Sequence, residues 1–213
     1  RRNLEVDFFG GEPLMNFEVV KQLVAYGRSR EKECNKQFRF TLTTNGVLLN
    51  DEIMEFANRE MGNVVLSTDG RKEVHDKMRP FRNGSGSYDL ILPKFQKFAD
   101  SRNQDKYYVR GTFTHHNLDF SKDVLHLADL GFKQISVEPV VAPKEADYAI
   151  REEDIPTMAK HAAAESNPLY PVPKLMNAKE LENKYYIVGG KHLKLLEENM
   201  LIEETEHGNR KIS

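Results

Sequence analysis

Cysteine is almost absent from this chain of 213 residues, in which Cys34 is the only one. A single thiol excludes an internal disulfide and any metal site that needs several cysteines of the same chain. No apolar run approaches the ~20 residues of a membrane span, and the first residues do not form a signal peptide. The formal net charge is only −2, so neither a nucleic acid nor a membrane surface is indicated as a partner. The expected location is the cytoplasm.

The length and composition fit one globular domain, with 39% hydrophobic and 30% charged residues. The chain starts at Arg1, without an initiator methionine, and a strand-like run follows almost at once at residues 4–9. We therefore expect that an element preceding this strand belongs to the protein. The pattern changes near residue 166, where Pro168, Pro171 and Pro173 follow in close succession. We predict a core at residues 1–165 and an extension of unknown class at residues 166–213.

Short apolar runs alternate with segments of helical period, which predicts α/β units around a parallel sheet or barrel. Each predicted strand ends in a polar or glycine-rich turn. Because the carboxyl ends of parallel strands meet on one face, these turns should converge in space, where ligand sites of such folds lie. The predicted strands are residues 4–9, 38–43, 64–67, 107–114 and 134–137.

The first turn, Gly10-Gly11-Glu12-Pro13, has the composition of a binding loop. Two glycines let the backbone approach a ligand closely, and Glu12 adds a carboxylate suited to an ammonium group. The same sequence also fits a plain turn between a strand and a helix. The spacing matches neither G-x-G-x-x-G nor a P-loop.

Ser67 and Asp69 follow the third strand and could bind ribose hydroxyls, or the serine could bind a carboxylate; Ser-x-Asp-Gly also fits a turn and helix cap. Arg110 lies within an apolar strand, where an isolated guanidinium is costly, so we expect a carboxylate partner. That partner could be a ligand or one of the acidic residues of the chain, Glu138, Asp7 or Glu5.

Other polar positions admit simpler interpretations. The turn at Asn45 and the strand end Glu138-Pro139 could be structural only. His115 and His116 are adjacent without acidic neighbours, which favours surface residues over metal ligands. His75 and Asp76 lie in a long polar connection, residues 71–86, where solvated side chains are the simpler prediction. Cys34 sits in a charged stretch and is interpreted as incidental.

Taken together, the turns resemble the core of the radical S-adenosylmethionine (SAM) enzymes. They are most similar to the SPASM-type peptide maturases, whose C-terminal domain is rich in cysteine. Residues 8–14 match the GGE motif of that family, and residues 74–88 are similar to a linker of thioether-forming SCIFF maturases. The resemblance covers about residues 4–160. The other matching segments are residues 43–46, 67–70 and 136–140.

The resemblance implies a partial (β/α)6 TIM-like barrel, of which this chain holds strands two to six. It also implies a 4Fe-4S cluster in the complete protein and a ribosomally made peptide as substrate. Gly10, Gly11 and Glu12 would hold the amino group of SAM, Ser67 and Arg110 its ribose and carboxylate. The remaining cofactor-binding positions implied are Pro13, Asn45, Asp69, Val137, Glu138 and Pro139; Val137 to Pro139 would flank the adenine.

The chain departs from the family because the first strand and the three cluster-binding cysteines are missing. The leading hypothesis is a fragment of an enzyme that generates a 5′-deoxyadenosyl radical to modify a peptide, with thioether cross-linking as the expected outcome. This chain alone should be inactive, and no catalytic or metal-ligating residue is assigned. The alternatives are a cluster-less fragment that binds peptide or nucleotide, and an ordinary barrel enzyme such as an aldolase.

Overall fold

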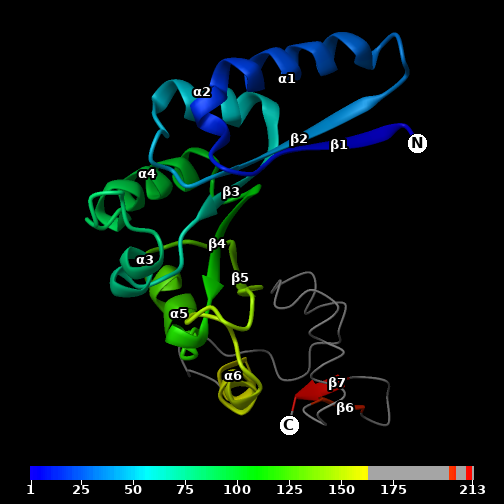
Figure 1. Cartoon of the computed structure of the whole chain (residues 1–213). Coiled ribbons are helices and arrows are strands. Elements are labelled where there is room, and N and C mark those ends of the chain that lie inside the picture. Colours follow the sequence, from blue (N-terminus) through cyan, green and yellow to red (C-terminus); the bar gives the residue numbers. More distant parts are fainter. Residues whose placement is uncertain (163–201, 205–209, 213) are drawn as a thin grey trace. The chain divides into compact units, whose positions relative to one another are not determined.

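The computed structural model describes residues 1–162, 202–204 and 210–212, and its main feature is a five-stranded sheet (Figure 1). The strands follow one another in the order β1-β2-β3-β4-β5, and the pairs from β1 to β4 are parallel. A separate antiparallel pair joins β6 to β7. The strands are β1 (Asn3–Phe8), β2 (Gln37–Thr44), β3 (Met61–Ser67), β4 (Tyr107–Phe113), β5 (Ile135–Pro139), β6 (Ile202–Glu204) and β7 (Arg210–Ile212).

Helices connect successive strands, as the alternating pattern predicted. Asn50 caps α2, because its side chain accepts a hydrogen bond from the Ile53 amide. Asn16 occupies the corresponding position before α1 but makes no such bond. The α-helices are α1 (Phe17–Glu31), α2 (Asp51–Glu60), α3 (Lys72–Met78), α4 (Tyr88–Ser101), α5 (Ser121–Asp129) and α6 (Ile155–Ala162), and the 3-10 helices are η1 (Pro13–Asn16), η2 (His115–Asn117) and η3 (Glu152–Asp154).

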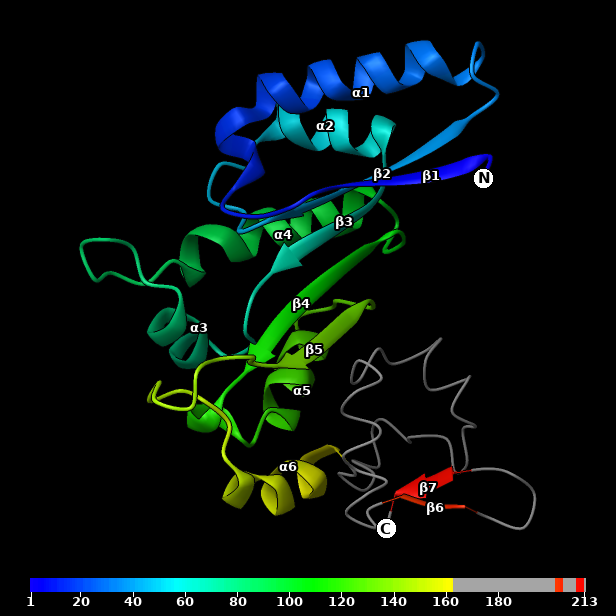
Figure 2. The same cartoon turned by 45° about the vertical axis from the view of Figure 1, so that its right-hand side comes forward.

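Strand alternation decides which face of the sheet is covered. In β2 the side chains of Phe40 and Leu42 are buried, whereas those of Arg39, Thr41 and Thr43, which alternate with them, are more exposed. The helices α1 and α2 run side by side over β1 and β2 in both views (Figures 1 and 2). The face of β2 that points away from these two helices is therefore the one that carries polar side chains.

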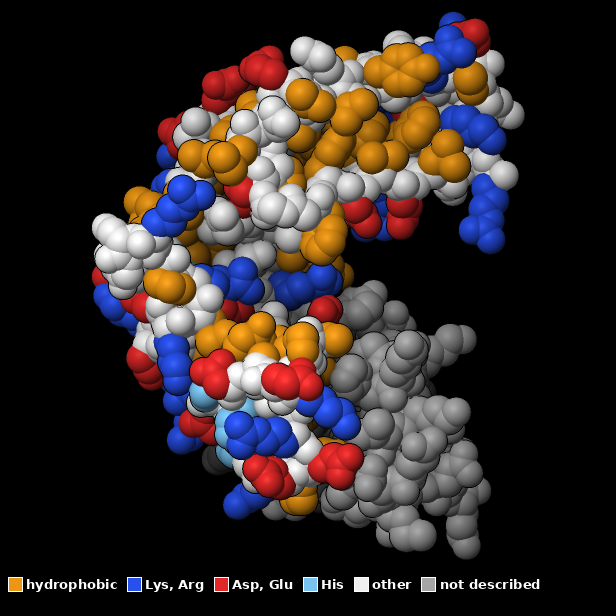
Figure 3. Space-filling model, in the orientation of Figure 1, with side chains coloured by type: hydrophobic (Ala, Val, Ile, Leu, Met, Phe, Trp, Pro, Cys, Tyr) orange, Lys and Arg blue, Asp and Glu red, His pale blue; other side chains and the backbone are white. Residues whose placement is uncertain are grey.

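Close packing of α1 on β2 depends on Gly27. A Cβ atom at this position would lie 2.7 Å from the ring of Phe40, a distance that real contacts essentially never show. The outer side of α1 carries Val19, Leu23 and Tyr26 at helical spacing, and all three are exposed. Figure 3 shows hydrophobic side chains at the surface over α1 and β1.

Two local predictions are wrong. Residues 71–86 are not a continuous loop, since they contain α3, and His75 is only 1% exposed rather than solvated. A glycine after a helical segment predicts the end of the helix, which would place the end of α2 at Gly62, but that helix ends at Glu60 and β3 begins at Met61. The strand expected at residues 185–188 and the helix expected at 192–199 lie outside the described residues.

The chain divides into two compact units. The first comprises Arg1–Thr68, His75–Arg110 and Leu130–Gln134, and the second comprises Asp69–Val74, Gly111–Asp129 and the residues from Ile135 onward. Each unit is described separately below.

Candidate functional site at the carboxyl ends of the strands

Glu12 is the central residue of the candidate site in the first unit. It follows β1, caps η1 by accepting a hydrogen bond from the Leu14 amide (3.1 Å), and reaches the end of β2. There its carboxylate accepts hydrogen bonds from the Thr44 hydroxyl (2.9 Å) and the Asn45 amide (2.7 Å). The carboxylate thus joins the turns after β1 and β2, and it keeps capacity for a further donor such as an ammonium group.

The backbone at Gly10 and Gly11 is open to a ligand. Both residues have positive φ, +91° and +52°, which favours glycine strongly. No atom lies within 4 Å of a Cβ built at either position, so the space beside the loop is accessible. Pro13 is the first residue of η1, where its missing N–H costs no hydrogen bond.

Asn45 serves first as a turn residue. Its side-chain oxygen accepts a hydrogen bond from the Val47 amide (3.0 Å), which is the Asx turn that such sequences favour. Its own amide is bound by Glu12. The side-chain NH2 group is the part of Asn45 that could reach a ligand.

Ser67 and Arg110 are brought together by strand register. Their Cα atoms are partners in the parallel pairing of β3 with β4, so their side chains leave the same face of the sheet. Both residues are only partly buried. Thr44, which Glu12 binds, pairs in turn with Leu66 beside Ser67. Strand pairing therefore places the carboxyl ends of β2, β3 and β4 next to one another in the first unit, with Glu12 bound at the end of β2.

The remaining predicted positions belong to the second unit. Asp69 is 4% exposed, and its carboxylate accepts a hydrogen bond from the Thr112 amide (3.0 Å). Val137 is buried and packs in a small core with Phe113 and Phe120, whereas Glu138 is exposed. Pro139 is the last residue of β5.

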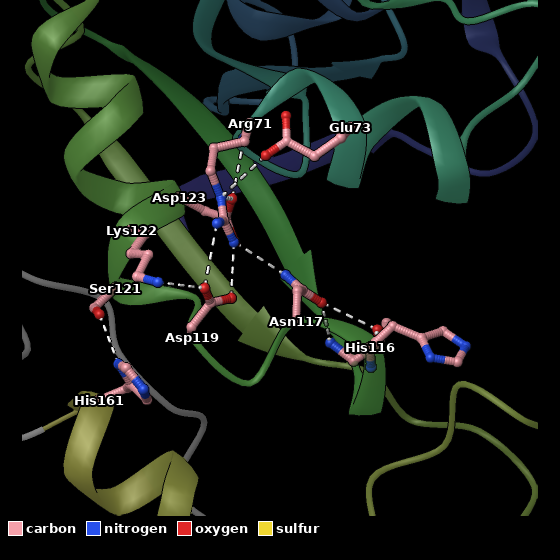
Figure 4. Close-up of polar contacts among 10 residues, drawn as sticks. Arg71, Glu73, His116, Asn117, Asp119, Ser121, Lys122, Asp123 and His161 are labelled. Atoms are coloured by element: carbon pink, nitrogen blue, oxygen red, sulfur yellow. Dashed lines mark hydrogen bonds and ion pairs between the residues drawn. The ribbon is translucent and has the colours of Figure 1, made fainter.

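An ion-pair network in the second unit was missed at the sequence level (Figure 4). The Arg71 guanidinium donates to Asp123 (2.7 Å) and, through another nitrogen, to Asp119 (2.7 Å). Asn117 donates to the second oxygen of Asp123 (3.1 Å). Because the hydrogen bond from Arg71 stabilises its charged form, the pKa of Asp119 lies below its ordinary value despite the opposing effect of burial. The two carboxylates stand four residues apart, as on one helix face, which was the available signal.

A second unforeseen feature is the buried imidazole of His75 in the first unit. The Ser87 hydroxyl donates to the Arg79 carbonyl, so it accepts from His75 Nε2 (2.9 Å). His75 Nδ1 lies 3.1 Å from the Thr68 hydroxyl. The imidazole therefore ties α3 to the end of β3 and to the start of α4.

His115 and Asp154 form a further pair in the second unit. His115 Nδ1 lies 2.8 Å from an oxygen of Asp154. Burial raises the pKa of Asp154, but hydrogen bonds from the Arg151 amide and from His115 outweigh it and the pKa is lowered. The adjacent histidines thus have an acidic neighbour that the local sequence did not reveal.

The donor set does not fit an iron–sulfur cluster. Within the described residues, no group of three His, Cys, Asp or Glu side chains could hold a metal ion. Cys34 is an exposed free thiol that follows α1. A cluster of the SAM-binding kind needs three thiolates, and the sequence has a single cysteine.

Comparison with known proteins finds a family model, curated proteins and solved structures that are similar to this chain. Residues 1–92 match the family model of a 4Fe-4S single cluster domain. The cysteine-type anaerobic sulfatase-maturating enzyme of Clostridium novyi is 29% identical over 92 residues, which cover 43% of this chain and 24% of that enzyme. The radical SAM cyclopropyl synthase TigE of Paramaledivibacter caminithermalis is 24% identical over 121 residues, covering 55% and 24% respectively.

An uncharacterised protein of Methanocaldococcus jannaschii is 31% identical over 146 residues, and the match covers 68% of this chain and 49% of that protein. The chain thus spans half or less of the length of these curated relatives. Among solved structures, native anSMEcpe with bound AdoMet and a bound peptide superposes with a TM-score of 0.69. It is 19% identical, and the match covers 77% of this chain and 46% of that one, which shows a shared fold.

These findings confirm the resemblance that the turn motifs indicated, and the cofactors of the relatives agree with the expected ones. The α/β architecture with a parallel sheet is confirmed as well. None of the described helices is both long and apolar enough to cross a bilayer.

Proposed function

We propose that this chain is the SAM-binding part of a radical SAM enzyme that modifies a peptide. The supporting observation is the edge of the sheet formed by the neighbouring carboxyl ends of β2, β3 and β4, with Glu12 bound at the end of β2. It offers a carboxylate, an open glycine backbone, a hydroxyl and a guanidinium in one unit. In this proposal the sheet supplies strands two to six of a partial (β/α)6 barrel.

The proposed roles follow from complementary charge. Glu12, held by three hydrogen bonds, presents a fixed negative charge to the ammonium group of SAM. Arg110 binds the carboxylate of the same amino-acid portion in a bidentate manner, and Ser67 binds a ribose hydroxyl. The backbone of Gly10 and Gly11 lies against the ligand without side-chain hindrance.

In the complete protein, one electron from a 4Fe-4S cluster would cleave bound SAM into methionine and the 5′-deoxyadenosyl radical, which would abstract hydrogen from the substrate. The contribution of the chain is to fix the amino-acid portion, and so the orientation of the ligand, at the strand ends. The peptide substrate is supported by the relatives named above, a sulfatase-maturating enzyme and a structure with bound peptide. We propose thioether cross-linking of a ribosomally made peptide as the reaction of the longer protein.

Calorimetry with two nucleosides tests the binding site. SAM and 5′-methylthioadenosine share the adenosine, but only SAM carries the amino-acid portion. Arg110→Gln should weaken SAM binding by roughly 10- to 100-fold, the equivalent of one charged hydrogen-bonded pair, and leave 5′-methylthioadenosine binding unchanged. Arg39→Gln, which removes a cation from the other end of the same sheet face, is the matched control.

An equal loss for both nucleosides in Arg110→Gln would show that the arginine supports the fold instead of the carboxylate. Unchanged SAM binding in both variants would reject the site. Enzymatic activity in air and without iron would favour the alternative of an ordinary barrel enzyme such as an aldolase.

A further inference from the structure

The opposite end of the first unit, at the other ends of the same strands, contains a concave surface. A groove of about 550 Å³ lies at the amino ends of β1, β2 and β3 and at the turn before β4. Two of its lining residues are carboxylates, Glu5 and Glu60, which form ion pairs with Arg39 and with Arg28 and Arg59 respectively. Five lining residues are cations: Arg28, Arg39, Arg59, Arg102 and Lys106. The chain as a whole carries a net charge of −2, so this local excess of positive charge is not a property of the average surface.

Two of the cations are rigidly held. Arg102 donates to the carbonyl oxygens of Ala57 (3.1 Å) and Met61 (2.9 Å), at the end of α2 and the start of β3. Arg28 donates to Glu31 (2.7 Å) and to the Phe38 carbonyl (2.9 Å). Their positions are fixed before any ligand arrives, which lowers the cost of binding.

The charge of Arg102 is not neutralised by a neighbour. In the part of the chain that the structure describes, its hydrogen bonds go to neutral oxygens and no carboxylate forms an ion pair with it. Burial lowers the pKa of its guanidinium, opposed by the charge of Asp105. A half-buried cation of this kind gains from an anion that enters the groove.

Arg39 and Lys106 are available to contact such an anion. Arg39 lies across Gly62, where a Cβ would come within 2.8 Å of its side chain, and its contact with Glu5 is long at 3.5 Å. Lys106 lies in a turn with positive φ at Asn103 (54°), Gln104 (59°) and Lys106 itself (55°). Three non-glycine residues in this conformation within one short turn are costly, and the turn carries the lysine to the groove.

We propose that this groove binds a phosphate-bearing anion. Planar guanidinium groups match the paired oxygens of phosphate, and a lysine adds a compact charge, so together they favour a ligand with more than one negative charge. The groove volume exceeds what inorganic phosphate needs, and Leu4 and Phe38 contribute apolar lining, which suits a phosphate ester with an organic portion. The site is separate from the candidate SAM site and does not depend on it.

Titration of the chain with pyrophosphate at low ionic strength tests the proposal by calorimetry and by amide chemical shifts. Saturable binding is expected with a Kd below about 1 mM, the range of a few charged contacts. The largest shifts should fall on the amides of Gly62 and Lys106. Lys106→Gln and Arg39→Gln should each weaken binding about tenfold, corresponding to one charged hydrogen bond.

The control is Lys77→Gln, which removes the same charge from an exposed position of α3 and should leave pyrophosphate binding unchanged. Citrate, a polycarboxylate of similar charge, should bind more weakly, because its charge is spread over three separate carboxylates. The proposal is overturned if pyrophosphate does not saturate, if Lys77→Gln weakens it as much as Lys106→Gln, or if citrate binds equally well. Because Arg110→Gln affects only SAM and Arg39→Gln only pyrophosphate, failure of one site is distinguishable from failure of the other.

Discussion

Glu12 should matter for stability as well as for binding, and Glu12→Ala tests both the size and the origin of the effect. The substitution removes the acceptor of three hydrogen bonds, two of them from the end of β2. A hydrogen bond to a charged group contributes about 1.5–3 kcal/mol and a helix cap about 1 kcal/mol, and water can reach this half-exposed side chain. Because water solvates part of the groups that lose their partner, the expected decrease in the free energy of unfolding is roughly 2–4 kcal/mol, less than the sum of the separate contributions.

Urea unfolding followed by circular dichroism measures this loss, which shifts the midpoint by roughly 1–2 M for a typical slope. Glu12→Gln should be milder, because one oxygen remains, although its NH2 group would face the Asn45 amide. Glu18→Ala removes an exposed glutamate that forms a surface ion pair with Lys21, and it should not shift the midpoint measurably. If Glu12→Ala unfolds at the same urea concentration as Glu18→Ala, the hydrogen bonds of Glu12 to the two turns do not contribute to stability, and the prediction is wrong.

Two further predictions concern the second unit and its neighbouring loop. Gly70→Ala should destabilise the protein by at least about 2 kcal/mol more than Gly84→Ala. Both glycines have positive φ, but a Cβ at Gly70 would lie 2.2 Å from the side chain of Asp123, whereas a Cβ at Gly84 would meet open space. Equal urea midpoints of the two variants would contradict this prediction. The lowered pKa of Asp119 means that its charged form stabilises the fold, a contribution present above the ordinary pKa of about 3.9 and lost as the pH falls through the lower folded value. Arg71→Met should therefore flatten the acid limb of the stability profile, and an unchanged limb would show that Asp119 owes its shift to other groups.

The parallel sheet could be predicted because its signal is local. Alternating apolar runs of strand length each sit between helical segments, and the strand order follows the chain, so β1 to β4 fall close to the predicted residues. The proximity of Ser67 and Arg110 could be predicted for the same reason, since both lie near the carboxyl ends of neighbouring strands.

The contacts that shape the site could not be predicted in this way because they join distant residues. Glu12 meets Thr44 across 32 positions of sequence, and nothing near Glu12 indicates that its carboxylate binds another turn. The helix α3 has seven residues, too few to display a helical period among so many polar side chains. The burial of His75 depends on Ser87 and Thr68, which flank it at distances that a pattern search does not connect.

The position of β1 has a consequence for the behaviour of the isolated chain. It is an outer strand of the sheet, so every second backbone N–H and C=O along Asn3–Phe8 points away from β2. Deuterium uptake along this strand should therefore alternate from residue to residue, slow where an amide is bonded to β2 and fast where it faces outward. Backbone groups that face outward from an edge strand can pair with a strand of another molecule. An apparent molecular mass that rises with protein concentration would indicate that copies of the chain associate through β1.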